Sequence, residues 1–244
     1  MNNNVVGYNQ DNARIVLRDY VTSACYNLQE QLGAGFLILS QAVFTDKIIP
    51  KSGWYAPEAV EFEQNVFLPA YKELYKSIFL RFARLYNKLS SSIDMWMKAT
   101  GAFGVQIAEF ASIYKGPVRE FVNAKPCDSE NNIRIGSLIL PTLLDESRAW
   151  KQKSFYIHKK GIIEKFQRSD VFIGVDQSVA LTKCVEETFI EIEDTYSLVF
   201  NKLYKEIQKS IEKYENIAKQ VASLLGSGSS ITSKSNLTQA NRLN

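Results

Sequence analysis

Apolar residues recur at steps of three and four along the first part of the chain, the spacing that places them on one face of an α-helix. The first stretch of this kind runs from about residue 11 to residue 44 and includes Leu17, Val21 and Leu28. This pattern predicts an amphipathic helix of roughly 30 residues.

A second helical stretch follows a connection at residues 45–55. Its start is predicted near Pro57, because the fixed φ and missing N–H of proline suit the first turn of a helix. Its end is predicted at Gly101, a residue type common just after a helix. Pro69 lies inside the stretch and is expected to kink the helix. The two helices are close enough in sequence to form an antiparallel hairpin.

Helical spacing returns in the second half of the chain, from about residue 143 to 167 and from about 179 to 225. The last stretch is the most regular, and its near-heptad pattern indicates a long seam that would face a partner helix. Tyr196, Leu203 and Ile207 lie on this seam. We therefore interpret them as candidate interaction residues.

The region between the two halves is less regular. Ile133 to Leu140 has some strand character, but Pro141 closes the run and no partner strand is obvious, so we expect a packed connector. When Gly53-Trp54 is set against Gly174-Val175, a long helical pattern follows each glycine.

The sequence thus predicts an all-α protein, an elongated helical bundle that could be organised as two tandem helical hairpins. The predicted segments are a flexible N-terminus at 1–10, a helical hairpin with Trp54 at the bend at 11–104, an irregular connector at 105–142, a second helical hairpin at 143–225 and a flexible tail at 226–244.

Composition agrees with long helices and narrows the function. The 244 residues include only 12 Gly and 6 Pro, so residues that break helices are few. The net charge of +3 is too small to indicate nucleic acid as a partner. No apolar run approaches the roughly 20 residues that span a bilayer, and no secretory signal peptide is visible. We expect synthesis in the cytoplasm, and any export to use a route without a cleaved signal peptide.

The chain lacks recognisable catalytic patterns. His158 is the only histidine, lies beside Lys159 and Lys160, and is expected to be an exposed helical residue. The three cysteines are widely separated and show no metal-ligand spacing. No phosphate-binding loop or dinucleotide fingerprint occurs. We therefore expect a protein that is not an enzyme and that has no cofactor or metal.

The bend at Trp54 carries two alternative interpretations. Trp54 could plug the end of the hairpin, or it could form a recognition surface together with Tyr55 and Phe62. A large aromatic side chain serves either purpose, because it can fill a core or anchor an interface.

A long helix, a tight bend with Trp54, and a second long helix beginning Pro57-Glu58-Ala59-Val60-Glu61-Phe62 resemble the WXG/LXG superfamily of type VII secretion substrates. The glycine precedes the tryptophan here, so the W-x-G order is not met. The export mark of that family, a tyrosine followed four residues later by an acid, occurs only as Tyr26 and Glu30 inside the first helix.

The resemblance implies a helical secretion substrate, or a targeting module of one, that acts through helix–helix association. Its partner would be another helical protein or a second copy of the chain. Two alternatives stay open. One is a helical, membrane-acting toxin component whose amphipathic hairpins insert, and the other is an intracellular structural or adaptor bundle. Membrane contact is expected only in the first alternative.

Overall fold

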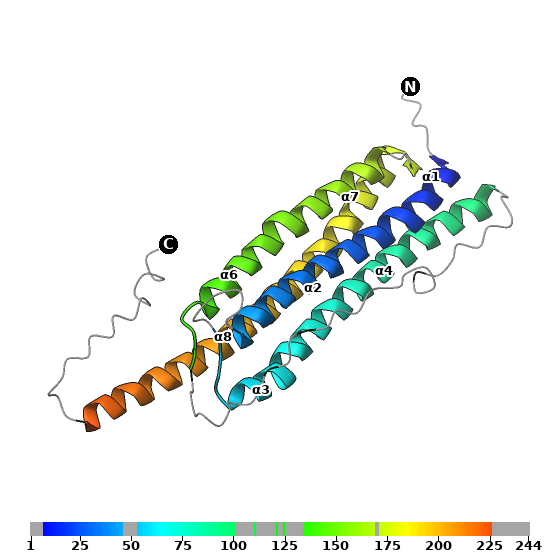
Figure 1. The fold of residues 1–244 in the computed structure, drawn as a ribbon. Coiled ribbons are helices and arrows are strands. Elements are labelled where there is room, and N and C mark those ends of the chain that lie inside the picture. Colours follow the sequence, from blue (N-terminus) through cyan, green and yellow to red (C-terminus); the bar gives the residue numbers. More distant parts are fainter. Residues whose placement is uncertain are drawn as a thin grey trace. The chain divides into compact units, whose positions relative to one another are not determined.

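The computed structural model describes residues 7–45, 53–100, 110, 121, 124, 134–168 and 171–225. Within these residues the fold is all-α, as predicted, and the only strands are the two-residue segments β1 (Gly7–Tyr8) and β2 (Phe172–Ile173). Figure 1 shows the long helices that make up the described part. The predicted tail at 226–244 and most of the predicted connector at 105–142 lie outside the described residues.

The first predicted helix is present as α1 (Gln10–Ile15), the π-helical segment η1 (Val16–Val21) and α2 (Thr22–Phe44). Backbone dihedrals at both junctions are right-handed helical, so the three segments form one continuous helix. Asn9 caps its start, because its side-chain oxygen accepts a hydrogen bond from the N–H of Asn12 at 3.0 Å. The prediction of a flexible N-terminus at 1–10 was wrong for Gly7 to Gln10, since these residues form β1, the cap and the first helical residue.

The second predicted helix comprises α3 (Glu58–Phe62), the π-helical segment η2 (Glu63–Phe67) and α4 (Leu68–Thr100). Its ends match the positions that Pro57 and Gly101 indicated. Pro69 has no N–H to donate to the preceding turn, and the chain widens into the π-helical segment immediately before it. The helix therefore passes through the proline without ending.

The second half of the chain contains α6 (Ile139–Ala149), the π-helical segment η3 (Trp150–Phe155), α7 (Tyr156–Arg168) and α8 (Val175–Leu224). The expectation that Pro141 closes an extended run was wrong, because α6 begins at Ile139 and Pro141 lies in its first turn. Proline is tolerated there, since the first N–H groups of a helix have no intrahelical acceptor.

The chain forms two compact units, and each draws segments from both predicted hairpins. Unit 1 consists of residues 1–34, 72–119 and 149–197. Its core contains a chain of aromatic contacts, in which Phe82 packs on Phe189, Phe189 on Phe155, and Phe155 on Trp150. The short ladder β1–β2 pairs Gly7 with Ile173 and Tyr8 with Phe172 in antiparallel register.

Unit 2 consists of residues 35–71, 120–148 and 198–244. Its aromatic core centres on Phe36, which is fully buried and contacts Phe67, Tyr71 and Phe200 with ring-centre separations of 5.2, 5.3 and 5.6 Å. Trp54 forms an isolated antiparallel bridge with Ile135. The sequence showed no partner strand for the region around Ile135, and in the structure Trp54 is that partner.

The two bends of the chain share one local design. In unit 1 the bend before α8 pairs with the residues that precede α1, and in unit 2 the bend before α3 pairs with Ile135, which precedes α6. Gly53 and Gly174 occupy equivalent positions when the two halves of the sequence are aligned, and they have φ of 138° and 150°. Both values lie in the region that side chains rarely adopt, so glycine suits each bend.

Candidate functional site

The bend of unit 2 holds Trp54 as a buried residue. Its side chain is 3% exposed, and its ring packs on Phe62 at a centroid distance of 5.0 Å. The backbone is fixed on both sides, because the N–H of Trp54 donates to Val43 at 2.5 Å and the N–H of Gly136 donates to the carbonyl of Gly53 at 2.9 Å. This geometry agrees with the plug interpretation of Trp54, since a recognition anchor would need an accessible ring.

The neighbours of Trp54 lie at different depths. Phe62 is 7% exposed and belongs to the same cluster, where it also contacts Phe44. Tyr55 is only partly buried, and the guanidinium of Arg134 lies 4.5 Å from the centre of its ring. Of the three bend residues proposed from the sequence, Tyr55 alone offers a partly accessible side chain.

The seam residues of α8 are buried within the chain. Tyr196 is 1% exposed and stacks on Trp150 of unit 1 at a centroid distance of 4.1 Å. Leu203 and Ile207, which belong to unit 2, are 0% and 2% exposed. This part of the seam therefore faces other helices of the same chain, and it leaves no side-chain area for a separate partner in this conformation.

The apolar spacing of α8 continues beyond Ile207, but burial does not. Ile217 and Val221 are 44% and 48% exposed, and Leu224 and Leu225 are 85% and 82% exposed. We call the segment from Ile211 to Leu225 the distal segment of α8. It presents an uncovered apolar stripe, a feature uncommon on a surface that stays solvated.

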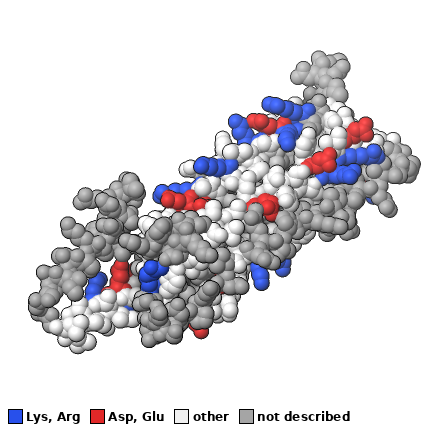
Figure 2. All heavy atoms as spheres, in the orientation of Figure 1, with Lys and Arg blue, Asp and Glu red and all other residues white. Residues whose placement is uncertain are grey.

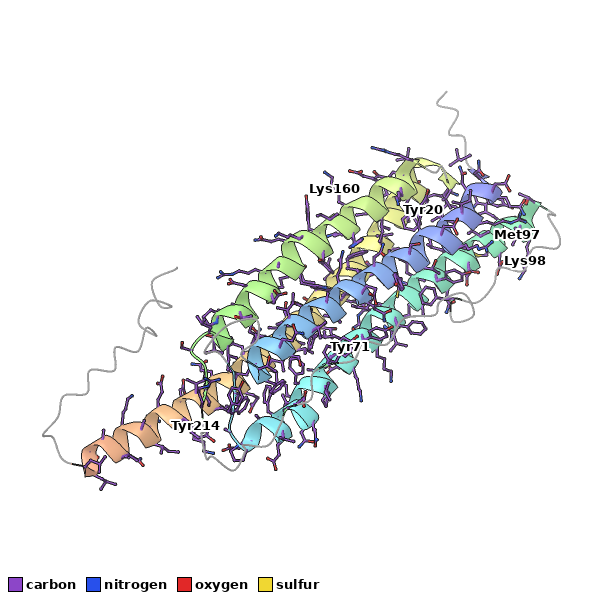
Figure 3. The ribbon with its side chains drawn as sticks, viewed as in Figure 1. Tyr20, Tyr71, Met97, Lys98, Lys160 and Tyr214 are labelled. Atoms are coloured by element: carbon purple, nitrogen blue, oxygen red, sulfur yellow. The ribbon has the colours of Figure 1, made fainter. Side chains whose placement is uncertain are left out.

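A pair of contacts holds the start of the distal segment in unit 2. Lys213 Nζ and the Tyr214 hydroxyl each donate to a carboxylate oxygen of Glu58, the first residue of α3, at 2.5 Å. Figure 3 shows Tyr214 on this part of α8. The bonds from Lys213 and Tyr214 lower the pKa of Glu58 to about 2. Glu58 is therefore ionised at neutral pH and fixes one turn of the distal segment.

Two other ionisable groups are partly or fully withdrawn from water. Glu63 in η2 is 2% exposed, and burial raises its pKa although one carboxylate oxygen accepts a hydrogen bond from the N–H of Ala124 at 2.5 Å. His158 in α7 is half-buried rather than exposed as expected, and burial together with the charge of Lys165 lowers its pKa. Among the described residues, no hydrogen bond joins His158 to a Ser, Thr or Cys side chain that could act as a nucleophile.

The face of the molecule drawn in Figure 2 carries charges of both signs. Figure 2 shows Lys and Arg side chains interspersed with Asp and Glu over the face in view. Among the described residues, no group of three or more His, Cys, Asp and Glu side chains is placed to hold a metal ion. No helix in the same part of the chain combines the length and the apolar character needed to cross a membrane.

Sequence reasoning missed a groove in unit 1, which lies along α4 and the first turns of α8 and has a volume of about 970 Å³. Periodicity could not reveal it, because its walls come from segments far apart in the sequence. Its lining residues are Arg84, Asn87, Lys88, Leu89, Ser91, Ser92, Met95, Trp96, Ala99, Phe172, Gln177, Ala180, Leu181 and Cys184.

Comparisons with known proteins add no assignment. No protein-family model, no curated protein and no solved structure matches the chain.

Proposed function

We propose that this chain is a non-enzymatic helical protein that binds a helical partner through the distal segment of α8. The observation that carries the proposal is the uncovered stripe formed by Ile217, Val221, Leu224 and Leu225. The proposal agrees with the resemblance to type VII secretion substrates, whose members act through helix–helix association. In that setting the chain would be an exported substrate or the targeting module of one.

The spacing of the stripe indicates what kind of partner it suits. Ile211, Tyr214, Ala218, Val221 and Leu225 follow alternating steps of three and four, the a and d positions of a heptad. Ile217 and Leu224 occupy the neighbouring g positions, so the apolar stripe takes up three of every seven positions. A stripe of this width is typical of a helix that packs against two other helices. We therefore expect a partner that contributes a helical hairpin rather than a single helix.

The energetics favour a covered state. Full burial of a Val, Leu or Ile side chain contributes about 1.5 to 3 kcal/mol, and the distal segment exposes several such side chains. Lys213, Glu215 and Lys219 alternate in sign beside the stripe. Flanking charges of both signs suit pairing with another mixed-charge helix rather than with an anionic lipid surface.

The proposal is tested with the double variant Val221→Asp/Leu225→Asp and a matched control, Gln220→Asp/Ser223→Asp, which places two charges elsewhere on the same turns. The partner tested is a small helical protein encoded beside this chain, co-expressed and co-purified with it, and export into the medium is measured in the source organism. We expect the first variant to lose partner binding and export, and the control to keep both. All the altered residues are exposed, so neither variant should change the melting temperature.

Three results would contradict the proposal. One is a strict monomer that binds no neighbouring helical protein. Another is unchanged binding and export in Val221→Asp/Leu225→Asp. The third is leakage of dye from lipid vesicles at low protein concentration, which would support the membrane-acting alternative instead.

A further inference from the structure

The two ends of the groove in unit 1 are lined by side chains of different chemistry. Arg84 and Lys88 lie at one end, and Met95, Trp96 and Ala99 follow along the same face of α4. On α8, Cys184 belongs to the charged end and Gln177 to the other, since the two helices run antiparallel with Arg81 beside Glu191. The groove thus has a basic end and an apolar trough.

The basic end carries both basic and acidic side chains, with the basic ones in excess. Arg84 lies 3.8 Å from Glu191, which also contacts Arg81 at 3.3 Å. Lys88 has no ion pair among the described residues, although Glu187 and Glu191 line an adjoining hollow together with Arg84 and Lys88. Burial raises the pKa of the Cys184 thiol, the charge of Lys88 opposes this rise, and the charge of Glu187 adds to it. Lys88 and Cys184 both line the groove. Among the described residues that line the groove itself, none is Asp or Glu.

Residues of β2 and the start of α8 line the other end of the groove. Phe172 of β2 forms part of its wall, and the ring of Trp96 packs on Tyr8 of β1 at a centroid distance of 5.7 Å. The side-chain amide of Gln177, oriented as its neighbours require, donates to the carbonyls of Ile173 and Gly7 at 3.0 and 3.3 Å. The β1–β2 ladder and the start of α8 therefore hold this end of the trough in place.

The size of the groove suits a small molecule. The eleven residue steps from Lys88 to Ala99 correspond to about 16 Å along α4. The groove holds about 970 Å³, within the range of small-molecule sites.

We propose that this groove binds a free long-chain fatty acid, with the carboxylate at Lys88 and Arg84 and the alkyl chain along the trough toward Trp96 and Phe172. A single-chain anion matches both the excess of basic side chains at one end and the apolar trough. This inference goes beyond the proposed function, because it concerns unit 1 and does not involve the distal segment of α8.

The test uses the full-length protein and stearic acid brominated near the middle of its chain. Bromine quenches tryptophan fluorescence at short range, and Trp96 is the tryptophan that lines the groove, whereas Trp54 and Trp150 are buried elsewhere. We expect saturable, partial quenching that disappears in Trp96→Phe. Lys88→Gln should weaken binding at least tenfold, and the matched control Lys76→Gln, an exposed lysine of α4 outside the groove, should bind as the unaltered protein does.

Two further measurements test whether the acid binds in this groove and through its charge. Ala180→Phe places a bulky group in the groove from an exposed position, so it should abolish quenching without changing the melting temperature. Stearylamine, which has the same chain and the opposite charge, should not displace the brominated acid. Equal binding in Lys88→Gln, equal competition by stearylamine, quenching without saturation, or binding only to phosphatidylglycerol vesicles would each overturn the proposal. Loss of partner binding through α8 would leave these results unchanged.

Discussion

Tyr214 donates its hydroxyl hydrogen bond to Glu58 at 2.5 Å and so joins α8 to the first residue of α3. Lys213 contacts the other oxygen of the same carboxylate. The two helices meet here although the residues are more than 150 positions apart in the sequence. The carboxylate also lies at the N-terminus of α3, where a negative charge interacts favourably with the helix dipole.

Glu58→Gln should destabilise the fold at neutral pH. The depressed pKa of Glu58 means that the folded state favours the ionised carboxylate, so this stabilisation is complete above the ordinary pKa of 4.5 and is lost as pH falls toward about 2. The side chain of Glu58 is 38% exposed, and after allowance for solvent screening we expect a loss of about 1 kcal/mol at pH 7. Urea denaturation at pH 7 and pH 2 measures it. Glu61→Gln on α3 is the control and should behave as the unaltered protein.

Glu63→Gln should have the opposite effect. Burial raises the pKa of Glu63, so the folded state favours its protonated form. Its contribution to stability is therefore greatest below the ordinary pKa and decreases as pH rises through the folded-state pKa. The amide is neutral at every pH, so the variant should be more stable than the unaltered protein at pH 7 and should lose this part of the pH dependence. A thermal-melting series from pH 4 to pH 8 checks it, with the exposed Glu73→Gln as control. A less stable variant at pH 7 would show that the buried carboxylate is better compensated than we infer.

The sequence predicted the helices well, because their ends carry local signals. Pro57 and Gly101 indicated α3 to α4 to within a residue or two, and the steps of three and four located α8. The same periodicity identifies the apolar face of a helix, but it does not show whether that face packs against the same chain or against a partner. Tyr196 and Leu203 therefore looked like a partner seam, whereas the chain covers them with its own side chains. The groove was not predictable either, since it depends on the register between α4 and α8.

Trp54→Ala should lower the free energy of unfolding by about 3 kcal/mol or more, the range for loss of a large buried aromatic. The residue is 3% exposed and its ring contacts Phe62, so the substitution would leave a cavity inside the aromatic cluster. Trp54→Phe should cost less, because a ring stays in the cluster and the indole N–H has no hydrogen-bond partner among the described groups. Chemical denaturation of both variants decides the matter. Unchanged stability in Trp54→Ala together with lost partner binding would restore the recognition interpretation.

The two bend glycines provide a test of the shared design of the bends. Gly53 has φ of 138°, and a Cβ there would lie 2.6 Å from the ring of Tyr55, while Gly174 has φ of 150°. Alanine is strained in this region, so Gly53→Ala and Gly174→Ala should each destabilise the fold by more than about 1 kcal/mol. Gly161 lies inside α7 with open space around it, so Gly161→Ala should instead stabilise by about 0.5 to 1 kcal/mol. Urea denaturation of the three variants would contradict the shared design if either bend glycine behaved like Gly161.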